Sequence, residues 1–89
     1  MAKCWAYVLQ SEKDEGYYVG ITSHLYRRIK EHNSGQNQST SSRAPWKLVY
    51  KEQFIDHKYA REREKYLKSG PGRTWLRENL AGHRPDTSG

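Results

Sequence analysis

A hairpin pattern at the start of the chain constrains its fold more than any other feature. Residues 4–10 alternate between the two faces of a strand, residues 11–16 are polar, and residues 17–22 form a second strand-like segment. Two strands joined by so short a polar run predict a β-hairpin. The side chains of the first strand divide between the two faces of the sheet as Trp5, Tyr7 and Leu9 on one and Ala6 and Val8 on the other.

A helix is predicted directly after the hairpin. Ser23 is suited to be its N-cap, and the helix is expected to end near residues 33–35. Its inward face, spaced at i, i+4 and i+7, consists of Leu25, Ile29 and His32. Residues 34–45 are rich in Ser, Gln and Asn and predict a loop. Such a loop is long for a small domain, and long loops in compact domains tend to be functional or mobile.

The second half of the chain predicts one more strand and two helices. Residues 47–55 form the strand, and Asp56 is suited to cap a helix over about residues 57–68. The sequence Gly70-Pro71-Gly72 is expected to break the chain before a short last helix at about residues 73–80.

These elements define the expected fold class and domain organisation. The fold is α/β of the α+β type, with a small, three-stranded, mostly antiparallel sheet flanked by helices in the order β-β-α-β-α-α. Residues 1–82 are expected to form one domain, and residues 83–89 a disordered tail with nothing to pack against. Only 34% of the residues are apolar. The core must therefore be thin, and large aromatic side chains must supply much of its buried area.

Charge and cysteine content favour an intracellular protein that binds polyanions. The formal net charge is +6, which suits a partner rich in phosphates. The lone Cys4 excludes an intramolecular disulfide and fits a reducing cytoplasm. No segment approaches the roughly 20 apolar residues that a membrane span needs. A cytoplasmic location is therefore expected.

Helical geometry distinguishes two neighbouring arginines. At about 100° per residue, Arg28 lies between Leu25 and His32 at the edge of the inward face, whereas Arg27 points well away from it. Arg28 is therefore expected to reach along the sheet toward the tyrosines, and Arg27 to face water. In any basic amphipathic helix, an arginine beside the apolar face would have the same spacing without a catalytic role.

The same reasoning selects one glutamate on the later helix. Glu64 lies four residues after Ala60 and three before Leu67, so its carboxylate leans toward the buried face, whereas Glu62 points almost the opposite way. An inward carboxylate is costly without a partner or a metal. A metal ion is one explanation, and an i,i+4 ion pair with Lys68 is the other.

Taken in order, these residues resemble a known enzyme family. Trp5-Ala6-Tyr7, then Tyr18-Val19-Gly20, then Arg28 and His32, and finally Glu64 resemble the motifs of the GIY-YIG nuclease superfamily. The resemblance is greatest to its small single-domain branch, related to the nuclease domain of the bacterial excision-repair incision subunit. The sequence departs from the family pattern at Trp5, which stands at a glycine position, and at Val19, which replaces isoleucine.

The resemblance implies a metal-dependent endonuclease that hydrolyses DNA phosphodiester bonds, in DNA repair or recombination. Mg²⁺ (or Mn²⁺) would be the cofactor, with Glu64 as its ligand, and DNA would be the partner, with branched and single-stranded DNA among its forms. A further protein could supply specificity. The implied catalytic residues are Tyr7, Tyr18, Arg28, His32 and Glu64, and the substrate-binding residues are Gly20, Arg43 and Arg73. The alternative is a nucleic-acid-binding module of the same fold that does not cleave.

The general base stays open between three groups. A free phenol has a pKa near 10 and is protonated at neutral pH. Arg28 and a nearby metal ion would lower the pKa of Tyr7 and favour its phenolate, and His32 could accept the proton onward. Tyr18 is the third possibility. Facing tyrosines on paired strands are also common as simple packing.

Overall fold

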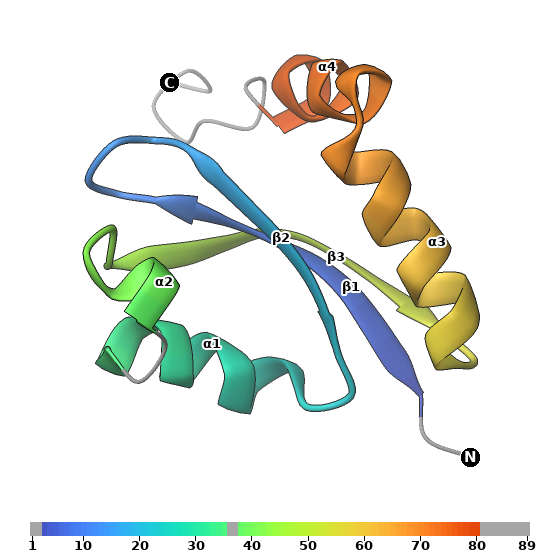
Figure 1. The fold of residues 1–89 in the computed structure, drawn as a ribbon, viewed down its shortest axis with the longest axis horizontal. Coiled ribbons are helices and arrows are strands. Elements are labelled where there is room, and N and C mark those ends of the chain that lie inside the picture. The colour runs from blue at the N-terminus through green and yellow to red at the C-terminus, as the bar shows by residue number, and fades with distance from the viewer. Residues whose placement is uncertain (1–2, 36–37, 81–89) are drawn as a thin grey trace, which may run out of the picture.

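The structure, a computed structural model, describes residues 3–35 and 38–80. Its elements follow the expected order, with one additional helical turn between the first helix and the third strand (Figure 1). The elements are β1 (Cys4–Ser11), β2 (Tyr17–Thr22), α1 (Leu25–Ser34), α2 (Gln38–Ser41), β3 (Trp46–Phe54), α3 (His57–Lys68) and α4 (Gly70–Leu80). The α+β class and the order β-β-α-β-α-α are confirmed.

The three strands form one antiparallel sheet in the order β2-β1-β3. Strand β1 is central, and Tyr7 is paired with Gly20 on one side and with Lys51 on the other. Strand β2 is therefore an edge strand with one free side. Figure 1 views the molecule with β2 in front of the other two strands.

Helices cover both faces of the sheet, as the two apolar faces of β1 require. Helix α1 lies on one side of the strands, and α3 with α4 lies on the other (Figure 1). On the α1 side the buried cluster consists of Tyr7, Leu9, Leu25 and Trp46. On the α3 side it consists of Val8, Val19, Leu67 and Leu76. The predicted division of β1 side chains between two faces is confirmed.

The helix caps agree with the sequence at one helix and differ at another. Asp56 caps α3 as predicted, because its side chain accepts a hydrogen bond from the backbone N–H of Tyr59. The prediction of Ser23 as the cap of α1 was wrong. The N-cap is His24, which makes no side-chain cap bond, and its own N–H donates to Thr22 Oγ1 at 3.0 Å.

Two other sequence predictions need correction. The segment 34–45 is not loop throughout, because α2 forms within it and buries Thr40 against the core. Gly70-Pro71-Gly72 does not precede the last helix but forms its first turn, where proline is well tolerated. Gly72 is needed there, because a Cβ would overlap the carbonyl oxygen of Tyr66.

One expectation, the tail at residues 83–89, lies outside the residues that the structure describes. Within residues 3–35 and 38–80, no helix is long and apolar enough to cross a membrane.

Candidate active site

Three side chains form a buried hydrogen-bonded chain between the sheet and the first helices. The Tyr7 phenol on β1 lies 3.2 Å from His32 Nε2 on α1, and His32 Nδ1 lies 2.9 Å from Thr40 Oγ1 on α2. All three residues are at most 2% exposed. The carbonyl of Thr40 in turn accepts a hydrogen bond from the Trp46 indole. This arrangement fixes both the Tyr7 phenol and the His32 ring.

Burial keeps Tyr7 and His32 uncharged. Desolvation raises the pKa of Tyr7 well above its ordinary value, Tyr18 adds to that rise, and Arg28 opposes it. Desolvation also lowers the pKa of His32, and Arg28 lowers it further. The sequence-based expectation had Arg28 favouring the Tyr7 phenolate. In the structure the effect of burial is larger, so Tyr7 is a neutral phenol at pH 7.

Tyr18 belongs to the same cluster but reaches solvent. Its ring centroid lies 4.8 Å from that of His32, 6.4 Å from Tyr7 and 6.1 Å from Trp46. Unlike Tyr7, Tyr18 is only partly buried, because β2 is the edge strand. Of the two phenols, Tyr18 is the one that a bound molecule can reach directly.

Gly20 makes room for Tyr7. A Cβ at this position would lie 2.7 Å from the Tyr7 hydroxyl oxygen and 2.8 Å from its Cζ, closer than such atoms approach. Sequence reasoning assigned Gly20 to close approach of a substrate. In the structure the Tyr7 side chain already fills the space above it, so the glycine is required for packing of the phenol.

Arg28 and Arg27 differ in the direction that helical geometry predicts. The Arg28 side chain is 44% exposed and that of Arg27 is 68% exposed, and each lies 3.7 Å from a carboxylate oxygen of Glu31. Arg28 also acts electrostatically on Tyr7 and on His32. Arg28 is therefore the arginine beside the buried phenol, with its guanidinium still accessible.

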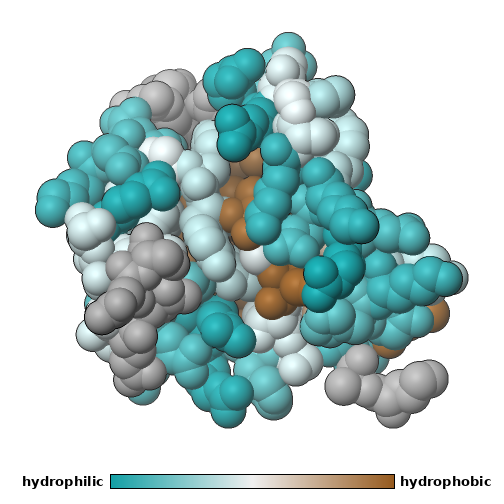
Figure 2. All heavy atoms as spheres, viewed as in Figure 1, coloured by the Kyte–Doolittle hydropathy of each residue, from teal (hydrophilic) through white to brown (hydrophobic). Residues whose placement is uncertain are grey.

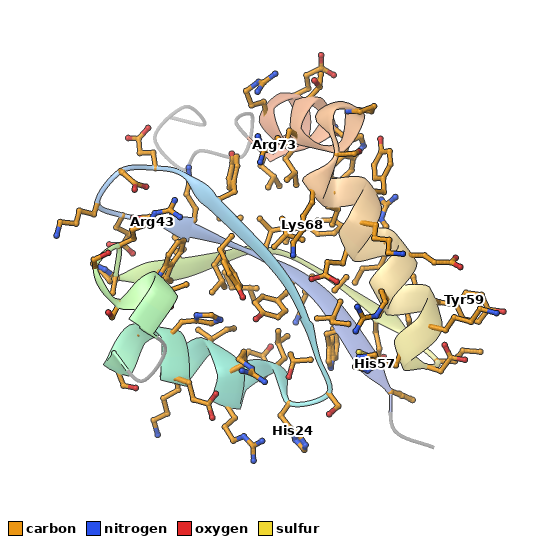
Figure 3. The ribbon with its side chains drawn as sticks, in the orientation of Figure 1. His24, Arg43, His57, Tyr59, Lys68 and Arg73 are labelled. Carbon is orange, nitrogen blue, oxygen red and sulfur yellow. The ribbon has the colours of Figure 1, made fainter. Side chains whose placement is uncertain are left out.

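Glu64 leans inward from α3, and Glu62 is exposed. The Glu64 side chain is only 16% exposed, and its carboxylate forms the i,i+4 ion pair with Lys68 at 2.9 Å. It lies across the sheet from α1 but still raises the pKa of Tyr7 electrostatically. Lys68 extends from α3 toward β2 (Figure 3). The i,i+4 ion pair with Lys68, one of the two explanations for an inward Glu64, is present. The carboxylate that was expected to bind a metal ion is therefore paired with a lysine.

Arg43 and Arg73, the two arginines expected to bind substrate, lie outside this cluster. Arg43 is held at the β1–β2 turn by Asp14, with contacts of 2.8 and 3.3 Å, and its guanidinium lies 4.8 Å from the Trp46 ring centroid. Its hydrogen bond lowers the pKa of Asp14 to about 2. Arg73 projects from α4 toward the upper part of β2 (Figure 3). Arg43 is thus a structural arginine in this state, whereas Arg73 is exposed.

A metal ion in this region would have few protein ligands. Among the described residues, no three His, Cys, Asp or Glu side chains converge on one point. One half-buried carboxylate, Glu64, nevertheless fits Mg²⁺, which keeps several waters and is often held by one or two carboxylates and substrate phosphate oxygens.

Sequence reasoning missed Thr40. It lies in a polar stretch with no apolar periodicity, and nothing local marks it as the residue that fixes His32. Its role depends on the fold of α2 against α1, which brings together residues eight positions apart in the chain.

Comparison with known proteins identifies relatives along most of the chain. Residues 3–75 match the model of the GIY-YIG catalytic domain. UPF0213 protein CPE1444 of Clostridium perfringens is 45% identical over 65 residues, covering 72% of this chain and 69% of its own. UPF0213 protein SH2523 of Staphylococcus haemolyticus is 37% identical over 70 residues, covering 78% of this chain and 84% of its own. The solution NMR structure of UPF0213 protein BH0048 from Bacillus halodurans superposes with a TM-score of 0.56 at 29% identity, covering 97% of this chain and 94% of that one.

Proposed function

This chain belongs to the GIY-YIG family, and from that premise we propose that it is a metal-dependent endonuclease that hydrolyses DNA phosphodiester bonds. The observation that carries the proposal is the cluster at the β2 edge. There an accessible phenol (Tyr18) and an accessible guanidinium (Arg28) adjoin the buried Tyr7–His32 pair, with an inward carboxylate (Glu64) within electrostatic range. Simple DNA binding does not require an inward carboxylate.

Each accessible group has a role suited to its position. Arg28 would neutralise charge that develops on the phosphate, the role of positioned cations in phosphoryl transfer. Tyr18 would orient the attacking water and, once ionised, accept its proton. We favour Tyr18 over Tyr7 as this group because Tyr7 is 2% exposed and its pKa is raised by burial.

Tyr7 and His32 would act as support for Tyr18. Their hydrogen bond and the contact of His32 with Thr40 hold the ring against which Tyr18 packs. A catalytic phenol works only if its oxygen is held in position, and packing against a fixed neighbour provides this.

Glu64 would hold Mg²⁺ or Mn²⁺, together with phosphate oxygens of the substrate and water. The bound ion would supply Lewis acidity at the phosphate. Lys68, whose side chain is 54% exposed, pairs with the half-buried Glu64 at i,i+4 on one helix, and such helix pairs contribute only about 0.3–0.5 kcal/mol. Exchange of Lys68 for a metal ion at Glu64 is therefore energetically accessible.

The cellular role follows from this activity and from the charge. A net charge of +6 on a small domain favours general phosphate binding, which positions DNA but reads little sequence. We propose a role in DNA repair or recombination in the cytoplasm, where a partner protein or a DNA structure supplies the specificity.

The test is an incubation of the purified protein with labelled double-stranded, single-stranded and branched DNA in Mg²⁺, Mn²⁺ or EDTA. Cleavage of at least one DNA with either metal, abolished by EDTA, is expected. Retention of DNA without cleavage under all conditions would instead favour a binding module of the same fold.

A further inference from the structure

A groove of about 760 Å³ runs beside the edge strand, on the side of the sheet away from α1. One wall is the end of the β1–β2 hairpin, where Tyr17 and Tyr18 lie, and the other is the junction of α3 and α4. Figure 2 shows hydrophobic residues visible in the middle of the face seen in Figure 1, with hydrophilic residues around them. The groove and the candidate active site share Tyr18.

Positive charge lines the helical wall of the groove. Lys68 comes from α3 and Arg73 and Arg77 come from α4, against one acidic residue, Glu15, on the hairpin side. Within the described part of the chain, the Arg73 guanidinium has no hydrogen-bond or ion-pair partner. Among the residues that the structure describes, Arg77 makes one side-chain hydrogen bond, to Thr74 Oγ1 on its own helix at 3.5 Å. These two arginines are free to bind an anion.

The floor of the groove is apolar and aromatic. Val19, Leu67 and Leu76 lie beneath it and are buried, at most 8% exposed, and the half-buried ring of Tyr17 packs against them. Cations beside a partly exposed aromatic ring are a combination that binds single-stranded nucleic acid, because the cations follow the backbone while a base stacks on the ring. A duplex has its bases stacked inside and would leave the Tyr17 ring without a base to stack on.

We propose that this groove binds a few nucleotides of an unpaired DNA strand that leads to the active site. This inference rests on the proposed nuclease function and adds the form of its substrate, a DNA with a single-stranded segment next to the cut. Continuity at the edge strand supports it, because Tyr18 lines the groove while its ring packs against His32 in the candidate active site on the other face of the sheet. The volume is within the range of about 300–1,000 Å³ of sites that enclose small ligands, so it suits a short segment.

The test measures binding of a short fluorescent oligothymidine in EDTA, so that cleavage plays no part. The groove variant is Arg73→Ala/Arg77→Ala. The matched control is Arg27→Ala/Lys30→Ala, which removes the same charge from exposed positions on α1. We expect the groove variant to bind at least about tenfold more weakly and to lose about 0.7 in salt slope per phosphate contact. The control is expected to stay within about twofold of the wild-type protein.

Several results would overturn the proposal. Equal weakening by both double variants would show that only total charge matters. A duplex of the same length, or polyglutamate, could displace the oligothymidine as effectively as unlabelled oligothymidine does. That result would show that the groove does not select an unpaired strand.

If wild-type protein bound no DNA of any form, the nuclease proposal itself would fail. Binding of oligothymidine that neither variant changes would contradict the groove alone.

Discussion

The phenolic oxygen of Tyr7 lies 3.2 Å from Nε2 of His32, and neither side chain is more than 2% exposed. The two tyrosines of the family motifs therefore occupy different environments. Tyr7 is a buried, neutral hydrogen-bonding group, whereas Tyr18, on the edge strand, is accessible. From this difference we expect substitutions of the two phenols to have separable effects on stability and on catalysis.

Tyr7→Phe is expected to lower stability more than it lowers the rate. The substitution leaves His32 Nε2 without its partner in a buried site, which costs about 1–3 kcal/mol. The free energy of unfolding, measured by urea titration, is therefore expected to fall by about that amount while DNA cleavage persists.

Tyr18→Phe is the matched comparison. It is expected to leave stability nearly unchanged and to slow cleavage by about 10²–10⁴-fold, the typical loss on removing a general base. If Tyr7→Phe abolished cleavage without changing stability, and Tyr18→Phe did not, then Tyr7 would be the base.

The stability of the fold is expected to decrease in mild acid because of His32. Its pKa is lowered in the folded protein, so the unfolded chain binds a proton first as the pH falls below the ordinary value of about 6.5. The stabilisation is complete above that value and is lost toward the lowered folded pKa. Urea titrations between about pH 7.5 and 5.5 are expected to show a decrease of at most about 1.4 kcal/mol per pH unit for this proton.

The exposed His24 provides the control for this measurement. His24→Gln is expected to keep the pH dependence, and His32→Gln to reduce it. An unfolding free energy that stayed constant over this pH range would contradict the buried, neutral imidazole.

Gly20→Ala tests the packing of Tyr7 against β2. The new methyl group would lie 2.7 Å from the Tyr7 oxygen, so the phenol or the strand must move, and overpacking of this kind costs about 1–3 kcal/mol. Gly70→Ala is the control, because no atom other than those of its chain neighbours and its own helix backbone lies within 4 Å of its Cβ position. Equal melting temperatures for the two variants would show that the space above Gly20 is not filled as described.

Arg28→Ala is expected to reduce cleavage about a thousandfold, by analogy with arginines that stabilise charge in phosphoryl transfer, while DNA affinity falls only modestly. Arg27→Ala removes the same charge from the more exposed neighbour and is expected to leave turnover nearly intact. Single-turnover rates and DNA affinity measured for both variants distinguish the two arginines. Similar losses from both would mean that general charge, and not position, matters.

Regular periodicity explains which features were predictable. The division of β1 between two faces, the inward tilt of Glu64 and the greater exposure of Arg27 follow from the geometry of single elements. The Asp56 cap is equally local. Such features depend on residues within about one turn of one another, so the sequence contains the information.

The remaining features depend on contacts between distant segments. His32 meets Thr40 only because α2 folds against α1, and Arg43 is held by Asp14, 29 residues earlier in the chain. The raised pKa of Tyr7 is likewise set by how completely helices and strands cover it. The groove beside β2 is formed by the hairpin and by α3 and α4, and no single segment shows it.

The most direct test of the metal-dependent site compares Glu64→Gln with Glu62→Gln. Glutamine keeps the size and hydrogen bonding of the side chain but removes the charge that would hold Mg²⁺. The half-buried Glu64 and the exposed Glu62 lie on different faces of α3. Mg²⁺-dependent cleavage of the preferred DNA is expected to be lost in Glu64→Gln, with folding retained, and to be nearly unchanged in Glu62→Gln. Full cleavage by Glu64→Gln, or equal losses in both variants, would contradict the account.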